Sequence, residues 1–242
     1  MKWTNILILC FCFQLNSFAQ QTIQFPAADN IILTADYYKL SDTSPFVLLF
    51  HEEGSSRGEF EEIAPRIKKL GYNCLAVDLR YGNKYEYVKN ETSEQLKSRG
   101  ISSKLYDARQ DIEASINYAF RLNHKPVILF GSSFSASLCL LAGEKNPKVK
   151  AVIGFSPGEF FGPAVSVKDS LSGYNKPVFL ASSAEESKYL NELIKSIPSV
   201  SRTVFSPSTG KGLHGAKSLN KACSSSNEYW LALSLFFREL QE

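Results

Sequence analysis

The sequence predicts an α/β domain whose central sheet is mostly parallel, with helices on both faces and a β-hairpin at the N-terminal end. Short apolar runs without polar alternation recur along the chain, as expected for strands buried on both faces of a parallel sheet. Helical periods of apolar residues separate these runs, so strand alternates with helix as in βαβ units. The size agrees, because 242 residues with 44% hydrophobic content suffice for one large buried core.

The first 19 residues have the pattern of a secretory signal peptide. A basic start precedes an apolar run over residues 6–15, and small residues then lead to Ala19. We therefore expect cleavage after Ala19, a single domain over residues 20–242, and a secreted or periplasmic protein without stable membrane insertion. A lipoprotein modified at Cys10 is an alternative, which the bulky residue just before that cysteine disfavours. A plain membrane anchor is another.

Charge and cysteine content restrict the partners of the chain. The formal net charge of +3 comes from 27 basic and 24 acidic residues without a long run of either sign, so no nucleic-acid partner is expected. Past the signal segment the chain keeps three cysteines and three histidines, and no pair of them has the spacing of a metal site. Cys74 and Cys139 lie in apolar runs, where a thiol acts as a small hydrophobic group. We therefore expect no metal.

The predicted elements follow in order along the chain. Residues 22–26 and 30–40 form the hairpin, and the later apolar runs predict strands over residues 46–50, 73–78, 126–130, 150–156, 176–182 and 201–207. Helical periods are expected over residues 60–70, 105–120, 190–194 and 230–237. In segments 81–102 and 157–175 the apolar residues have no clear helical or strand periodicity, and each segment follows a predicted strand. Because ligands of open α/β sheets bind beyond the carboxyl ends of the strands, these two segments are the expected pocket walls.

One strand-to-helix junction, "FGSSFSAS", holds four serines within six positions. A nucleophile on a sharp turn at this point needs small residues two positions before and two positions after it. Ser132 has phenylalanine at both positions, while Ser135 and Ser137 lie past the turn. Ser133 has Gly131 before it and Ser135 after it, so Ser133 is the candidate nucleophile. The alternative is that these serines only cap the helix.

A serine hydroxyl needs a base to take its proton and a further group to orient that base. In this architecture the order along the chain is serine, acid, histidine, and His214 is the only histidine after Ser133. His214 lies in a glycine-rich loop after the last predicted strand, at the edge of the sheet where Ser133 is expected. His124 comes just before a predicted strand, so we expect it at the opposite end of the strands from Ser133.

A second loop at this edge, "HEEGSSRGEF", follows the strand over residues 46–50. Gly54 suits a turn, and Ser56 with Glu59 fits a capping box for the next helix. Such a loop keeps backbone N–H groups free, and together with the N–H of Phe134 they would complete a binding site for an oxyanion. His51 is expected to be a buried residue that braces the loop.

Four segments, "HEEGSSRGEF", "AVDLR", "GSSFSAS" and "LHG", together resemble the α/β-hydrolase superfamily, in particular its dienelactone-hydrolase-like and small esterase-like members. The resemblance spans nearly the whole mature chain and implies the α/β-hydrolase fold and hydrolysis of carboxylic esters without a cofactor. It also implies that Asp78 and Arg80 brace the structure and that the N–H of Glu53 is the second oxyanion donor. The chain departs from the family where Glu52 and Glu53 follow His51, because these carboxylates lie beside a site meant for negative charge.

The acid is sought just past the predicted strand over residues 176–182. Hydrolases of the type that the chain resembles usually place it nine residues after the position of Pro177, which is Glu186 in this chain. This spacing favours Glu186 over Glu185, although aspartate is commoner in this role. Asp169, or a dyad without an acid, is a further alternative. Both glutamates also suit the start of a helix, where carboxylates interact favourably with the dipole.

Segment 157–175 is too short for a large lid, so the cap is expected to be short or absent and the pocket shallow and open. Aromatic side chains would line it, or would simply pack there: Phe160, Phe161, Tyr85 and Tyr87. The predicted reaction transfers the acyl group of a small-molecule ester to water through an acyl-enzyme. Two rival interpretations are a catalytically weak or inactive binding protein on this fold, and a serine peptidase or acyltransferase. The glutamates after His51 favour the first rival.

Overall fold

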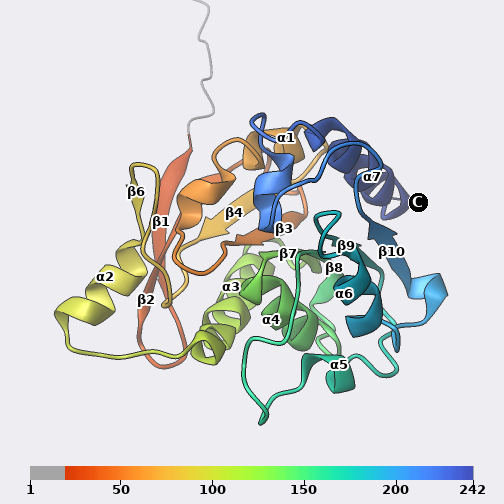
Figure 1. Ribbon diagram of the computed structural model, residues 1–242. Coiled ribbons are helices and arrows are strands. Elements are labelled where there is room, and N and C mark those ends of the chain that lie inside the picture. The colour runs from red at the N-terminus through yellow and green to blue at the C-terminus, as the bar shows by residue number, and fades with distance from the viewer. Residues whose placement is uncertain (1–19, 242) are drawn as a thin grey trace, which may run out of the picture.

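The computed structural model describes residues 20–241, and the predicted signal segment lies outside them. Eight strands form one sheet in the order β1-β2-β4-β3-β7-β8-β9-β10, which runs through the centre of the molecule (Figure 1). They are β1 (Gln21–Pro26), β2 (Ile32–Tyr38), β3 (Phe46–Phe50), β4 (Asn73–Val77), β7 (Val127–Ser132), β8 (Val149–Phe155), β9 (Val178–Ala181) and β10 (Arg202–Phe205). A separate small hairpin pairs β5 (Lys84–Tyr85) with β6 (Val88–Lys89).

The architecture that the sequence predicts is confirmed. The six strands from β4 to β10 in the sheet order pair in parallel, and the N-terminal hairpin β1-β2 joins their edge antiparallel. Every residue of β3, β4 and β7 is buried, which explains why these strands read as continuous apolar runs. The last predicted strand, over residues 201–207, is shorter than expected and only half-buried, because β10 forms the edge of the sheet.

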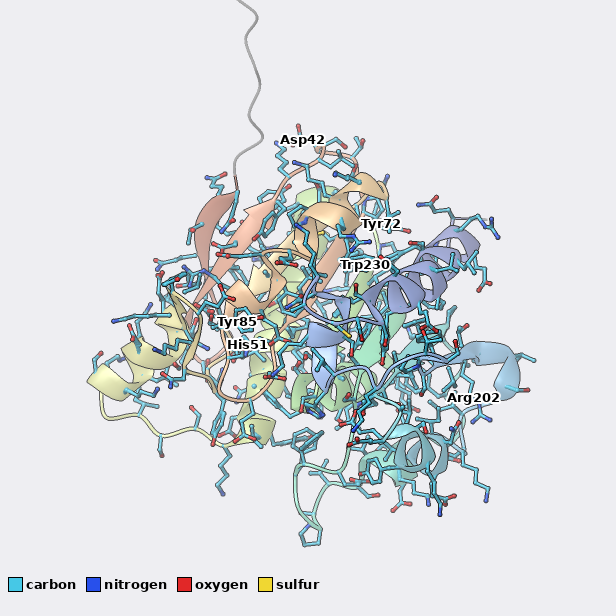
Figure 2. All side chains as sticks on the ribbon, turned by 45° about the horizontal axis from the view of Figure 1, so that its top comes forward. Asp42, His51, Tyr72, Tyr85, Arg202 and Trp230 are labelled. Carbon is cyan, nitrogen blue, oxygen red and sulfur yellow. The ribbon has the colours of Figure 1, made fainter. Side chains whose placement is uncertain are left out.

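Helices cover both faces of the sheet (Figure 1). One core cluster lies under α1 (Ala64–Lys69) and α7 (Ser226–Glu239), and it includes Tyr72 and Trp230, which are labelled in Figure 2. The opposite cluster packs mainly against α3 (Arg109–Asn123), α4 (Phe134–Gly143) and α6 (Ser187–Leu193). The remaining elements are α2 (Glu91–Ser98), α5 (Val167–Ser170), and the short 3₁₀ turns η1 (Arg57–Phe60), η2 (Leu105–Ala108), η3 (Ser199–Ser201) and η4 (Gly215–Leu219).

The two segments without a clear period differ in structure. Segment 81–102 contains the β5-β6 hairpin and α2, whose polar composition hides its helical period. The side chain of Asn90 accepts a hydrogen bond from the Ser93 N–H, 2.8 Å, and so caps the start of α2. Segment 157–175 has only the four-residue helix α5. Within the described residues, no helix is long and apolar enough to cross a membrane.

Asp78 and Arg80, at the end of β4, each take part in a buried ion pair. Arg57 Nη1 lies 2.5 Å from Asp78 Oδ2, and Arg80 Nη2 lies 2.7 Å from Asp111 Oδ1. Removing one partner of such a pair leaves a buried charge without compensation, which costs about 3–5 kcal/mol. The two pairs therefore fix η1 and α3 to the carboxyl end of β4, beside the site described next.

Candidate active site

Ser133 lies on a sharp turn between β7 and α4, with φ of 59° and ψ of −123°. Such a backbone conformation costs a serine roughly 1–3 kcal/mol and persists only where its surroundings hold it. Its N–H donates to the Phe155 carbonyl, 2.8 Å, and its carbonyl accepts from the Ala136 N–H, 3.0 Å. The turn presents the Ser133 side chain at the carboxyl edge of the sheet, and only 5% of the residue is exposed.

The residues two before and two after Ser133 explain why the chain can make this turn. A Cβ atom at Gly131 would lie 2.4 Å from the backbone nitrogen of Ala136, so only glycine fits there. Ser135 occupies the position where a second glycine is commoner. Its hydroxyl accepts from the Ser132 N–H, 2.9 Å, and lies 2.7 Å from the Phe50 carbonyl as a donor. Ser135 therefore fastens the turn to the end of β3.

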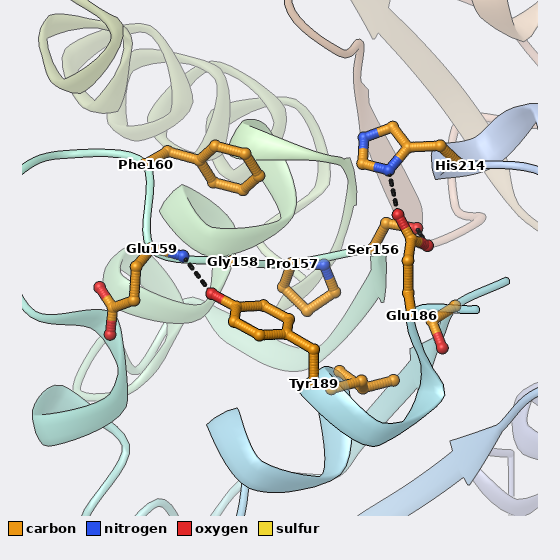
Figure 3. Close-up of a pocket in the computed structure, with 10 residues that line it drawn as sticks. Ser156, Pro157, Gly158, Glu159, Phe160, Glu186, Tyr189 and His214 are labelled. Atoms are coloured by element: carbon orange, nitrogen blue, oxygen red, sulfur yellow. Dashed lines mark hydrogen bonds and ion pairs between the residues drawn. The ribbon is translucent and has the colours of Figure 1, made fainter. Parts of the chain in front are cut away.

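His214 and Glu186 meet Ser133 in one hydrogen-bonded chain. The Oγ of Ser133 lies 2.8 Å from Nε2 of His214, and Nδ1 of His214 lies 2.5 Å from Oε1 of Glu186. Figure 3 shows the imidazole above the carboxylate, which comes from the residue just before α6. Because the Nδ1–H of His214 donates to the Glu186 carboxylate, the imidazole presents an unprotonated Nε2 to the serine hydroxyl. The geometry matches that of a serine hydrolase triad.

The charges of this chain suit the same arrangement. The hydrogen bond to Glu186 is the largest influence on His214, and it raises the pKa of the imidazole above its ordinary value. Burial alone would raise the pKa of Glu186, but hydrogen bonds from His214, Ser156 and the Ser183 N–H outweigh it and lower that pKa to about 2. Glu186 is therefore ionised at neutral pH and stabilises the imidazolium that forms when His214 takes a proton.

Ser156, at the carboxyl end of β8, forms hydrogen bonds to Glu186 and to the loop that carries His214. We did not predict this role from the sequence. The Ser156 hydroxyl donates to Oε2 of Glu186, 2.7 Å, and accepts from the Gly215 N–H, 3.0 Å. A polar residue just past a buried apolar run, at the edge where Ser133 lies, is the signal that points to it.

The structure brings none of the other candidate acids to His214. The side chain of Glu185 is 75% exposed and lies 3.4 Å from Lys211. Asp169 lies in the short helix α5 on the surface.

Phe134 and Glu53 carry the N–H groups expected to bind an oxyanion. Neither N–H donates to an acceptor within residues 20–241. The Glu53 side chain is exposed, and the neighbouring carboxylate of Glu52 lies 2.6 Å from the ammonium of Lys217. Both N–H groups thus remain available to a ligand, and one of the two unexpected carboxylates is neutralised.

His51 braces this loop from inside the protein. Its Nδ1 donates to the Glu52 carbonyl, 2.8 Å, and its Nε2 accepts from the Leu79 N–H, 3.0 Å, and from the Asn90 amide, 3.1 Å. Burial lowers the pKa of His51 to about 4, so its ring stays neutral. His51 has the bracing position that the sequence predicts, and Figure 2 shows it near Tyr85, whose N–H donates to the Ser56 hydroxyl of the same loop.

A pocket of about 210 Å³ opens beside His214 and Glu186 (Figure 3). Its apolar wall consists of Pro157, Phe160, Tyr189 and Leu190. The N–H of Glu159 donates to the Tyr189 hydroxyl, 3.0 Å, which joins the two sides of the wall.

Of the four aromatic residues expected to line the pocket, the structure places only Phe160 on its wall. Phe161 packs edge-on against Tyr106, with ring centroids 5.5 Å apart, and the hydroxyl of Tyr85 accepts from Asn220. Tyr87 is 96% exposed in the turn of the β5-β6 hairpin. The hairpin carries these two tyrosines away from the pocket. Among the described residues, no group of three or more His, Cys, Asp or Glu side chains is arranged to hold a metal ion.

Comparison with known families identifies the family of the chain. A model of the dienelactone hydrolase family matches residues 35–194. The chain belongs to this family. Membership confirms the resemblance to α/β hydrolases and supports a hydrolase that acts on esters. A comparison with curated protein sequences gives no significant match.

Several solved structures share the fold. An esterase from Pyrococcus furiosus has a TM-score of 0.66 at 17% identity, over 92% of this chain and 93% of that protein. A dienelactone hydrolase from Anabaena variabilis has a TM-score of 0.67 at 14% identity, over 91% of this chain and 97% of that one. Esterase 2 from Thermogutta terrifontis has a TM-score of 0.63 at 15% identity, over 89% and 91%. At these low sequence identities, the structural similarity shows only that this member of the dienelactone hydrolase family shares their fold.

The contact between Glu186 and His214 predicts a change in titration. In Glu186→Gln the charge that stabilises the imidazolium is lost, so the pKa of His214 should fall. An NMR pH titration of the imidazole protons measures it, and the chain has only three histidines to assign. Glu185→Gln is the matched control and should leave His214 unchanged. Equal effects of the two changes would contradict the assignment of Glu186.

Proposed function

We propose that the protein is a serine hydrolase that cleaves carboxylic esters of small molecules, with Ser133 as nucleophile, His214 as base and Glu186 as the acid that orients it. The observation that supports this proposal best is the continuous hydrogen-bonded chain from Ser133 through His214 to Glu186 on a strained turn. A serine that only capped α4 would accept from an N–H of the first turn, and the Ser133 side chain makes no such hydrogen bond.

The reaction follows from these positions. Ser133 Oγ attacks the ester carbonyl carbon while its proton passes to Nε2 of His214, and the N–H groups of Phe134 and Glu53 stabilise the tetrahedral oxyanion. The oxyanion collapses, the alcohol leaves with the proton from His214, and an acyl-enzyme ester remains on Ser133. Water then attacks this ester, again with His214 as base, and the free acid leaves. The sequence of steps requires no cofactor or metal.

The pocket suggests the size and charge of the substrate. A volume of about 210 Å³ lies below the range of pockets that hold drug-sized ligands, so it fits a short acyl chain or a small ring. Neither lysine nor arginine lines it. The lining, which includes Glu159 and Glu186, therefore disfavours an anionic ester, and its apolar wall suits an apolar group with the remainder of the substrate in solvent.

Glu52 and Glu53, on which the interpretation as an inactive binding protein rests, are compatible with catalysis. Lys217 neutralises the carboxylate of Glu52, and the side chain of Glu53 is exposed to water, which screens its charge. The backbone N–H of Glu53, rather than its side chain, is the proposed donor.

Activity on a short-chain aryl ester tests the proposal. Ser133→Ala should reduce turnover to background, and His214→Ala should fall nearly as far, because residues of one triad act as a unit. Ser135→Ala should leave a folded enzyme with reduced activity, because its hydroxyl supports the turn without reaching the substrate. The release of the chromogenic alcohol measures all three. Full activity of His214→Ala, or equal losses from the two serine changes, would contradict the proposal.

We also propose that the protein is exported and that residues 1–19 are removed. The basic start, the short apolar run and the small residues before Gln20 support it. N-terminal sequencing of the exported protein should find Gln20 first. An intact N-terminus, or a lipid-modified Cys10, would contradict cleavage at this position.

A further inference from the structure

Glu59, in the 3₁₀ turn η1, is a fully buried carboxyl group behind the loop that carries Glu53. Only 1% of the residue is exposed, and its Oε2 accepts a hydrogen bond from the Glu52 N–H, 2.9 Å. The capping box expected for Ser56 and Glu59 is therefore not closed. The Ser56 hydroxyl accepts from the Gly58 N–H, 3.3 Å, but the carboxyl of Glu59 reaches back to Glu52 instead of the Ser56 N–H.

The hydrogen bonds around Glu52 determine the direction of the Glu53 N–H. The Glu52 carbonyl accepts from His51 Nδ1, 2.8 Å, and from the Ser55 N–H, 3.3 Å. This carbonyl and the Glu53 N–H belong to one peptide group, and no peptide bond of the described chain is cis. In a trans peptide the two groups point in opposite directions. With Glu59 on its N–H and His51 on its carbonyl, Glu52 is held on both sides, and the Glu53 N–H points away from His51.

Two buried carboxylate oxygens here have no hydrogen-bond partner within the described chain, Glu59 Oε1 and Glu52 Oε2. A buried acceptor without a partner is costly unless a proton is present to satisfy it. Lys217 satisfies only the other oxygen of Glu52, Oε1, at 2.6 Å. A proton on Glu59 Oε1 removes the charge from this buried oxygen and avoids two negative charges in one buried place.

The groups that face Glu59 come from several elements. They are the Glu52 carboxylate, the Lys217 ammonium, the Tyr85 phenol and the hydroxyls of Ser55 and Ser132. Burial is the main reason that the pKa of Glu59 is raised to about 7, and the negative charge of Glu52 is the second. Together they outweigh the influence of the Ser132 and Ser55 hydroxyls and the hydrogen bond from the Glu52 N–H, which lower the pKa.

We propose that Glu59 is a positioning residue for the oxyanion-binding loop and that it acts in its protonated form. This inference rests on the proposed function. The protonated carboxyl accepts from the Glu52 N–H and so orients the next peptide, whose N–H is the proposed donor to the oxyanion. When Glu59 loses its proton, a negative charge arises behind the peptide that must stabilise a developing negative charge, so the ester is hydrolysed more slowly.

Glu59→Gln separates the two protonation states, because glutamine has the shape of the protonated acid and cannot ionise. Wild-type kcat on a neutral aryl ester should decline as the pH rises above about 7, with KM little changed. Glu59→Gln should match wild type at pH 6 and lack this decline, while both keep the rise in activity that accompanies deprotonation of His214. Glu59→Ala loses the acceptor for the Glu52 N–H, and its kcat should fall about tenfold or more at every pH.

Glu185→Gln removes an exposed carboxylate and serves as the matched control, with a pH profile like that of wild type. An infrared band from a protonated carboxyl group at pH 6, lost in Glu59→Gln, tests the protonation without any turnover. The same alkaline decline in Glu59→Gln, a Glu59→Gln variant as impaired as Glu59→Ala, or an absent infrared band would overturn the inference. A wild-type chain that hydrolyses no ester at any pH would overturn the proposed function instead.

Discussion

The left-handed backbone of Ser133 is the constraint on which the rest of the site depends. It requires α4 to begin in close contact with the sheet, and the chain allows this with two glycines in neighbouring strands. Gly131 of β7 pairs with Gly154 of β8 in the sheet register. A Cβ on either glycine would meet Ala136 of α4, at 2.4 Å from its backbone or 3.3 Å from its side chain. Packing as well as hydrogen bonds thus maintains the strained backbone conformation of Ser133.

The serines beside Ser133 attach the turn to the walls of the candidate site. The Ser132 hydroxyl accepts from the Ala216 N–H of the histidine loop, 2.9 Å, and Ser135 reaches the end of β3. Ser137 accepts from the N–H of Gly158 in the pocket wall, 2.9 Å. Four serines in six positions therefore have different tasks. Ser133 is the proposed nucleophile, and the other three hold the loops that surround it, which would keep the site preorganised for the proposed reaction.

The sequence was sufficient for the fold, and it also indicated three residues that the structure brings together, Ser133, His214 and Glu186. Each of these predictions depends on local chemistry or on the spacing of the family that the chain resembles. Buried parallel strands are apolar throughout, the turn at Ser133 demands small neighbours, and family spacing indicates Glu186. The partners of side chains on distant loops depend on the assembled fold. Ser156 stabilises Glu186 and the histidine loop only after β8 and β9 pair. The sequence predicts that Glu59 accepts from the Ser56 N–H in a capping box, but in the folded chain it accepts from the Glu52 N–H. Tyr87 is aromatic, but its hairpin points it into solvent.

The site of covalent attack tests the central claim most directly. The mature protein is treated with a fluorophosphonate, and the tryptic peptide that spans residues 122–145 and holds all four serines is fragmented in a mass spectrometer. One adduct on Ser133 is predicted, with labelling strongly slowed in His214→Ala because the serine loses its base. An unlabelled protein, or an adduct on Ser132, Ser135 or Ser137, would contradict the account.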